Sequence, residues 1–167
     1  MIRQLAFGAA LVAATLNAVP ASALSCVNPS VASTYQRAAE SPIDYVIGVG
    51  QLTLTGQSTP PEGAVAQGGD INQMVGYTQP ARFVGEFFTG SGFDSSRDVP
   101  VTVDVTCAAA WCGQASDVAY GLIFFSVEDG TYTLTENACP WDVFHDAHPG
   151  MLAEVMSCHQ GACAGAW

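Results

Sequence analysis

Six cysteines are the residues whose type and spacing most restrict the chemistry of this 167-residue chain. Two pairs among them have the spacing Cys-x4-Cys. An even number of cysteines in an exported chain favours a disulfide framework, and six cysteines allow fifteen connectivities. Two such pairs are also compatible with a tetrahedral zinc site, although an oxidising compartment disfavours it. We therefore expect disulfides, with zinc as the alternative, at Cys26, Cys107, Cys112, Cys139, Cys158 and Cys163.

Histidines near the C-terminus form a second group that could do chemistry. His145-Asp146-Ala147-His148 offers two imidazoles and a carboxylate, and His159 follows Cys158. Such a group can capture a metal ion or make a pH-sensitive patch. Because His-x-x-His is common by chance in polar loops, surface histidines without a special role remain the favoured interpretation.

The sequence lacks the motifs of several large enzyme classes. It has no Gly-x-Ser-x-Gly, His-Glu-x-x-His, Walker loop or complete dinucleotide fingerprint. The chain has no lysine, which excludes Schiff-base and Ser-Lys mechanisms. Carboxylates fall mostly at predicted strand ends and turns, where solvated residues are normal: Asp94, Asp98, Asp117, Glu128 and Asp129. We expect no catalytic, cofactor-binding or metal-ligating residues. The alternative is an enzyme whose carboxylates and histidines converge from distant positions.

The N-terminus has the three parts of a secretory signal peptide. Met1-Ile2-Arg3 is a charged start, the segment from Leu5 to Leu16 is apolar, and Ala21-Ser22-Ala23 is an A-x-A cleavage site. We expect cleavage after Ala23, and cleavage just before Cys26 is the alternative. The apolar run is shorter than the ~20 residues that span a bilayer. The sequence thus predicts a periplasmic or extracellular protein with no membrane anchor after cleavage, residues 24–167 forming one domain.

The charge of the chain excludes one class of partner. The formal net charge is −11, and all four basic residues are arginines. A phosphate backbone would be repelled by such a surface, so nucleic acid is not an expected partner. Acidity is also an ordinary aid to the solubility of an exported protein.

Apolar patterns predict a mainly β domain between two helices. A helix is expected from Ser30 to Glu40, with Ser30 as its cap, and a closing helix from Pro149 to Cys158. Between them, the glycine- and proline-containing segment from Gly56 to Gly76 is predicted to be a long loop, and the tail beyond Cys163 to be flexible. Alternating patterns predict five strands, the first with a bulge at Gly50: 43–55, 82–89, 99–106, 118–127 and 131–135.

Adjacent phenylalanines in two of these strands must point to opposite faces. They are Phe87-Phe88 and Phe124-Phe125, and one ring of each pair has to leave the barrel interior. We expect the outward rings to lie under the closing helix. The alternative is an aromatic binding face on the barrel.

The order of several short motifs resembles that of a known family. The motifs are Ser25-Cys26-Val27-Asn28-Pro29, Gly48 in the first strand, Cys112-Gly113, and Cys139-Pro140-Trp141-Asp142 followed by Cys158. Together they resemble the netrin-like domain, as in the inhibitory domain of tissue inhibitors of metalloproteinases and similar bacterial exported domains. The resemblance covers nearly the whole mature chain. It implies a five-stranded OB-like barrel with an N-terminal and a C-terminal helix.

The same resemblance implies a disulfide pairing and argues against one activity. It matches Cys26 with Cys139 and leaves Cys112 and Cys158 to local bridges with Cys107 and Cys163. In the inhibitors a first cysteine chelates the zinc of the target enzyme, and Leu24 stands in its place here. We therefore expect an exported, non-enzymatic module that binds a protein or peptide. A small periplasmic enzyme and a metal-binding protein are the alternatives.

Overall fold

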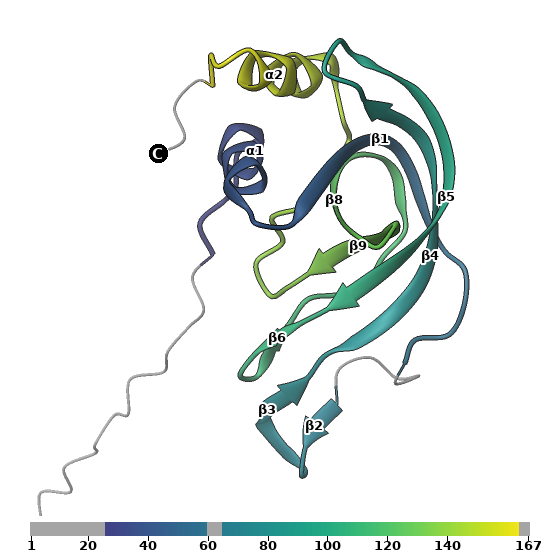
Figure 1. The fold of residues 1–167 in the computed structure, drawn as a ribbon. Helices are drawn as coiled ribbons and strands as arrows, with labels where there is room; N and C mark the ends of the chain where they lie inside the picture. Colours follow the sequence, from purple (N-terminus) through teal and green to yellow (C-terminus); the bar gives the residue numbers. More distant parts are fainter. Residues whose placement is uncertain (1–25, 60–64, 164–167) are drawn as a thin grey trace, which may run out of the picture.

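The computed structural model describes residues 26–59 and 65–163 (Figure 1). The predicted signal peptide, Leu24 and the tail beyond Cys163 lie outside these residues. Both predicted helices are present in the described part of the chain, as α1 (Val31–Glu40) and α2 (Pro149–His159). Among the described residues, no helix is long and apolar enough to cross a membrane.

Five strands form a closed ring, and the five predicted strands correspond to them. They are β1 (Asp44–Leu54), β4 (Tyr77–Phe88), β5 (Phe93–Val105), β8 (Val118–Glu128) and β9 (Thr131–Glu136). The order around the ring is β1-β4-β5-β9-β8, and β8 pairs with β1 to close it. Neighbours are antiparallel except for β5 and β9, which run parallel.

Shorter strands extend the ring or stand beside it. β10 (Val143–His145) pairs with β8, and two separate hairpins are formed by β2 (Val65–Gln67) with β3 (Asp70–Val75), and by β6 (Cys107–Ala108) with β7 (Trp111–Cys112). In Figure 1 the β2–β3 hairpin lies at the opposite end of the ring from the helices.

The predicted loop from Gly56 to Gly76 is wrong in its second half, where β2 and β3 form. Gly68 and Gly69 have φ of 61° and 83°, the left-handed conformation of a two-residue hairpin turn. The sequence predicted a loop here because the strands on either side of the two glycines have no alternating hydrophobic pattern. Val65 and Val75 are exposed in the structure. The hairpin therefore left no hydrophobic pattern to detect.

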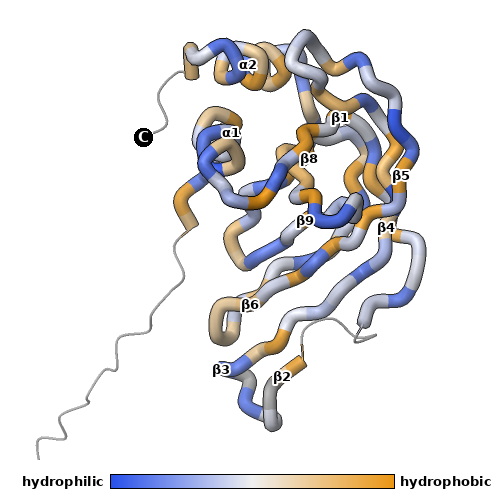
Figure 2. The backbone as a smooth tube through the Cα atoms, viewed as in Figure 1, coloured by the Kyte–Doolittle hydropathy of each residue, from blue (hydrophilic) through white to orange (hydrophobic). Residues whose placement is uncertain are grey.

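β4 and β5 are longer than their apolar patterns predicted. β4 begins at Tyr77 although Pro80 lacks an N–H, and the carbonyl of Pro80 accepts a hydrogen bond from Thr55, just beyond the end of β1. The missing N–H of Pro80 therefore falls on the β1 side, beyond the end of that strand, and the β4–β5 ladder loses no donor. β5 begins at Phe93, in a polar stretch that pairs with β4. In Figure 2 the upper part of β5 carries the hydrophilic residues of this polar stretch.

The bulge predicted at Gly50 is confirmed. The register between β1 and β8 shifts between Gly50 and Leu52. A Cβ at Gly50 would lie 2.4 Å from the carbonyl oxygen of Val84, so the strands approach too closely for any other residue. The bulge bends β1 strongly, which lets the ring close.

Two hydrophobic clusters lie on the two faces of the ring. Phe83, Phe87 and Phe125 fill the interior. Phe124 and Phe88 lie outside, with Val155 of α2. The prediction that the outward rings lie near the closing helix is confirmed, because Phe88 also contacts His159 and both phenylalanines belong to the cluster with α2.

Three disulfides join the six cysteines in the pairs that the resemblance implied: Cys26–Cys139, Cys107–Cys112 and Cys158–Cys163. The first ties the segment before α1 to the loop between β9 and β10. The second closes the β6–β7 hairpin, and the third closes the end of α2. With every thiol oxidised, the alternative of a zinc site built from the two Cys-x4-Cys pairs is wrong.

Candidate functional site

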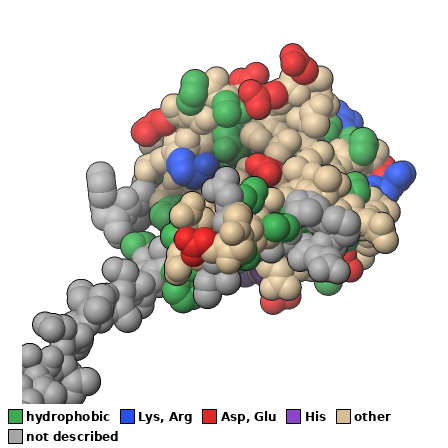
Figure 3. All heavy atoms as spheres, turned by 90° about the horizontal axis from the view of Figure 1, so that it is seen from below, with side chains coloured by type: hydrophobic (Ala, Val, Ile, Leu, Met, Phe, Trp, Pro, Cys, Tyr) green, Lys and Arg blue, Asp and Glu red, His purple; other side chains and the backbone are tan. Residues whose placement is uncertain are grey.

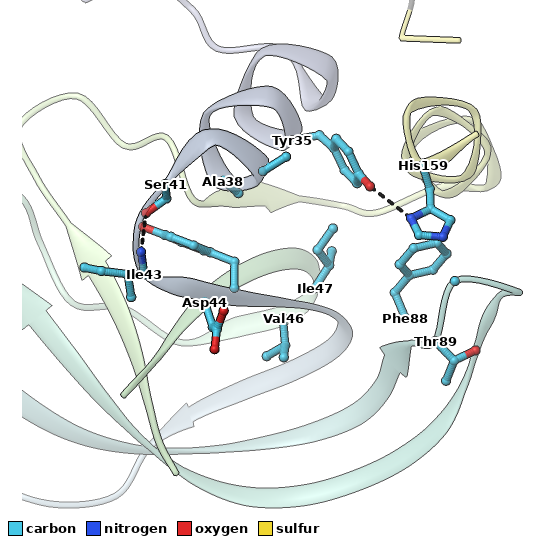
Figure 4. A pocket seen from close by; sticks show the side chains of 13 residues that line it. Tyr35, Ala38, Ser41, Ile43, Asp44, Val46, Ile47, Phe88, Thr89 and His159 are labelled. Atoms are coloured by element: carbon cyan, nitrogen blue, oxygen red, sulfur yellow. Dashed lines mark hydrogen bonds between the residues drawn. The ribbon is translucent and has the colours of Figure 1, made fainter. Parts of the chain in front are cut away.

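A pocket of about 420 Å³ lies where both helices meet the ring (Figure 4). Its walls are the last turn of α1, the first residues of β1, the end of α2, and the turn between β4 and β5. This volume falls within the range of small-molecule and cofactor sites. The lining residues are Tyr35, Ala38, Ala39, Ser41, Ile43, Asp44, Tyr45, Val46, Ile47, Phe88, Thr89, Gly90 and His159.

Helix α1 places Tyr35 in this pocket. The hydroxyl of Ser30 accepts a hydrogen bond from the N–H of Ser33, and the Ser33 side chain accepts one from the N–H of Ser30, which is a capping box. Val31 and Ala38 are buried against the ring. With that face fixed, Tyr35 extends from α1 toward α2, as Figure 4 shows.

Helix α2 places His159 opposite Tyr35. Val155, one turn earlier, is fully buried, and this anchors the helix on the outer cluster. The Tyr35 hydroxyl and Nδ1 of His159 are 3.1 Å apart, and the imidazole meets the ring of Phe88 edge-on at 5.2 Å. Burial raises the pKa of Tyr35, so its hydroxyl stays protonated and able to donate to the imidazole.

The start of strand β1 lines the pocket with an edge that is not paired to any other strand of the described residues. β1 pairs with β8 from Asp44 onward, but its pairing with β4 begins at Gly48. β4 ends at Phe88, and the chain turns there, with the N–H of Thr89 donating to the carbonyl of Gly92. The first three residues of β1 therefore pair with β8 on one side and border the pocket on the other.

A partly buried ion pair supports the pocket from behind. The guanidinium of Arg37 on α1 bonds to the carboxylate of Asp142, and its Nη1 donates to the hydroxyl of Tyr45 at 3.4 Å. The guanidinium carbon also lies 5.6 Å from the centre of the Tyr45 ring. Tyr45 lines both the first pocket and a second one of about 260 Å³ around this ion pair, so Arg37 fixes a side chain that both pockets share.

Two carboxyl groups at this ion pair have raised pKa values: Asp142, which belongs to the pair, and its neighbour Glu136. Burial, followed by the negative charge of Asp142, raises the pKa of Glu136 to about 7. Burial also raises the pKa of Asp142, and the positive charge of Arg37 offsets part of that rise. For Arg37, burial lowers the pKa, but the charge of Asp142 and the contact with Tyr45 outweigh it and raise the pKa. Glu136 is thus a carboxyl group that titrates near neutral pH.

The histidines that the sequence singled out do not gather in one place. His145 ends β10 and lines a pocket of about 250 Å³ with Glu136. His148 precedes α2 at its N-cap without a side-chain capping bond, and His159 lies in the Tyr35 pocket. In residues 26–59 and 65–163 no group of three or more His, Cys, Asp or Glu side chains could hold a metal ion.

Three of the five carboxylates that the sequence singled out make structural contacts with neighbouring strands or turns. Asp94 accepts a hydrogen bond from Thr89, Asp98 pairs with Arg82, and Asp117 accepts from the N–H of Leu54. The pair that does converge, Glu136 and Asp142, was not predicted as a site. Its sequence signal was weak: Asp142 stood in the Cys-Pro-Trp-Asp motif, but nothing local linked it to Arg37, 105 residues earlier.

The remaining question is whether known proteins share this arrangement. No protein-family model, no curated protein and no solved structure matches the chain.

Proposed function

We propose that this chain is an exported, OB-like, netrin-like domain that binds a partner protein or peptide without turning it over. Two features support the OB-like part. The five strands close in the order β1-β4-β5-β9-β8 with the parallel pair β5–β9, which suits a small Greek-key barrel. The Cys26–Cys139 bridge also occupies the position that the family resemblance assigns to it.

The observation that carries the proposed function is the pocket at Tyr35. It combines aromatic walls from Tyr35, Tyr45 and Phe88 with a few polar groups, as binding sites do. Its elements are tied down by the Cys26–Cys139 bridge on one side and Cys158–Cys163 on the other. A ligand would therefore meet a preformed site, and little binding energy would be lost in ordering it.

Site-specific photo-crosslinking tests this function. A photoreactive amino acid replaces Thr89 or Ala39, two exposed residues of the pocket rim, and Thr53 as a matched control at the far end of β1. Exported extract should give a discrete adduct from the two rim positions and none from Thr53, and the purified partner should reproduce it. Equal labelling from Thr53, or no adduct from either rim position at micromolar bait, would show that the pocket is not the binding site.

One observation favours the enzyme alternative. Glu136, with a pKa of about 7, lines the pocket of about 250 Å³ together with His145. A carboxyl group that titrates near neutral pH is suited to general acid–base catalysis. An activity screen of the wild type beside Glu136→Gln and His145→Ala decides the matter: a turnover signal lost in both variants supports an enzyme, and no turnover supports the binding module.

A further inference from the structure

The open edge of β1 presents backbone hydrogen-bonding groups to the pocket. The N–H of Phe124 on β8 donates to the carbonyl of Asp142, so Phe124 directs its backbone groups toward β10. In an antiparallel ladder these directions alternate, and Ile47, the partner of Phe124, must direct its own groups away from β8. The same holds for Tyr45, two residues earlier. Since β4 starts to pair only at Gly48, Tyr45 faces the pocket, and no strand within residues 26–59 and 65–163 pairs with it on that side.

Side chains on this stretch of β1 alternate between two different surroundings. Tyr45 and Ile47 lie on the face covered by α1, whereas Asp44 and Val46 point to the other side of the strand (Figure 4). A strand added at this edge would have to alternate in the same way. Its side chains on the α1 face would meet Tyr35 and Phe88, and those on the other face would meet Asp44.

The charge around the pocket selects a cationic occupant. None of the 13 lining side chains drawn in Figure 4 is Lys or Arg, and Asp44 is exposed. Glu40 is exposed at the end of α1, and Glu86 is exposed two residues before Phe88. The last turn of α1 adds the partial negative charge of a helix C-terminus. Arg37, the cation nearest along α1, is engaged by Asp142.

The rest of the surface agrees with this selection. On the face shown in Figure 3, acidic side chains are spread over the molecule and basic ones are few. A formal net charge of −11 attracts cationic partners over longer distances and speeds their encounter. The pocket therefore adds a local site to a general electrostatic preference.

We propose that the pocket binds an extended segment of a partner protein that alternates apolar and basic residues, adding it as a strand to the free edge of β1. The backbone of the segment hydrogen-bonds to Tyr45. Its apolar side chains pack beside Tyr35 and Phe88, and its Lys or Arg side chains lie near Asp44. This mode, β-strand addition, takes its affinity from main-chain bonds and its specificity from alternate side chains. The inference rests on the proposed binding function and names its ligand class.

The test uses the mature, oxidised protein and a capped hexapeptide that alternates lysine and valine. Amide hydrogen exchange is followed residue by residue by NMR. With peptide at about ten times its Kd, the exchange of the Tyr45 amide should slow about tenfold, because only the unbound fraction still exposes it. The Thr53 amide, at the paired end of β1, is the internal control.

Three altered peptides separate recognition of the backbone from recognition of charge. N-methylation of the three residues of one edge removes the donors that the β1 edge requires, and methylation of the other three leaves them in place. One of these two peptides should lose binding at least about tenfold, and the other should keep it. A peptide alternating glutamate and valine should not bind.

A pair of protein variants tests the charge. Asp44→Asn should weaken the lysine peptide about two- to fivefold, the range for an exposed ion pair. Asp104→Asn, which removes the same charge in a different pocket, should leave the affinity unchanged.

Several results would overturn the inference. They are no binding of the lysine peptide at millimolar concentration, equal affinity of both methylated peptides, protection at amides elsewhere on the ring, or occupation of the edge by a second copy of this chain. Pocket crosslinks to a partner, combined with any of these, would keep the binding function and reject strand addition. If neither pocket crosslinks nor peptide binding is observed, both the binding function and strand addition are rejected.

Discussion

The guanidinium of Arg37 on α1 is paired with the carboxylate of Asp142, which precedes β10, across 105 residues of sequence. The side chain of Asp142 is only 6% exposed, whereas that of Arg37 is 39% exposed. Asp142 also contacts β8 through its backbone, because its carbonyl oxygen accepts a hydrogen bond from the N–H of Phe124. The ion pair thus joins α1, the loop after β9 and the outer edge of β8 behind the Tyr35 pocket.

Loss of Arg37 should destabilise the fold. Arg37→Met leaves the buried Asp142 carboxylate without its partner, and we expect the free energy of unfolding to fall by about 2–3 kcal/mol, less than for a fully buried pair because Arg37 is partly solvated. Urea denaturation measures the change. Arg82→Met breaks the exposed Arg82–Asp98 pair as a matched control and should change the free energy of unfolding much less than Arg37→Met does. Equal effects of the two variants would contradict the assigned role of Arg37.

Glu136 should make stability fall as pH rises. Its pKa is about 7 in the folded chain against an ordinary value of 4.5, so the folded state binds more protons between these two values. The contribution of Glu136 to stability is therefore greatest below about pH 4.5. It declines between about pH 4.5 and pH 7 and stays low at higher pH, where the group is ionised. Asp142, whose pKa is raised as well, acts in the same direction.

Glu136→Gln tests this dependence. The variant should match the wild type near pH 4 and exceed its free energy of unfolding at pH 8 by about 2–3 kcal/mol. Urea denaturation across the pH range measures both, with Glu128→Gln in the exposed β8–β9 turn as the control. Parallel curves for wild type and Glu136→Gln would show that Glu136 is not the group responsible.

The long disulfide should contribute more stability than a short one. Cys26–Cys139 closes a loop of sequence separation 113 and Cys107–Cys112 one of 5. In the chain-entropy description these correspond to about 5 and about 2 kcal/mol. Urea denaturation of the double serine variants, one bridge at a time, measures the order. A larger loss from the Cys107–Cys112 variant would mean that loop entropy does not dominate here.

The domain should not inhibit zinc metalloproteases at micromolar concentration. The mechanism of the inhibitors that the sequence resembles needs an N-terminal cysteine on the target's zinc, and the expected cleavage after Ala23 would place Leu24 there. Mass spectrometry first establishes the N-terminus, and a titration against a panel of such enzymes then measures inhibition. Stoichiometric inhibition by the form that begins at Leu24 would contradict the prediction. Inhibition only by a form that begins at Cys26 would instead show that the assigned cleavage site is wrong.

Local patterns in the sequence were enough for the main elements. Ser30 marked the start of α1, the slip at Gly50 marked the bulge of β1, and the phenylalanine pairs showed that aromatic rings would lie on both faces of the ring. These features are predictable because caps, bulges and side-chain alternation depend on residues a few positions apart.

Features that depend on distant partners could be decided only by the tertiary structure. The β2–β3 hairpin buries too little to leave a pattern, and the pairing of Arg37 with Asp142 has no local signal. The open edge of β1 arises because β8 follows the strand to Asp44 while β4 leaves it at Gly48. Where one strand stops pairing with another is set by the bending and closure of the whole ring, so the sequence of β1 alone does not contain it.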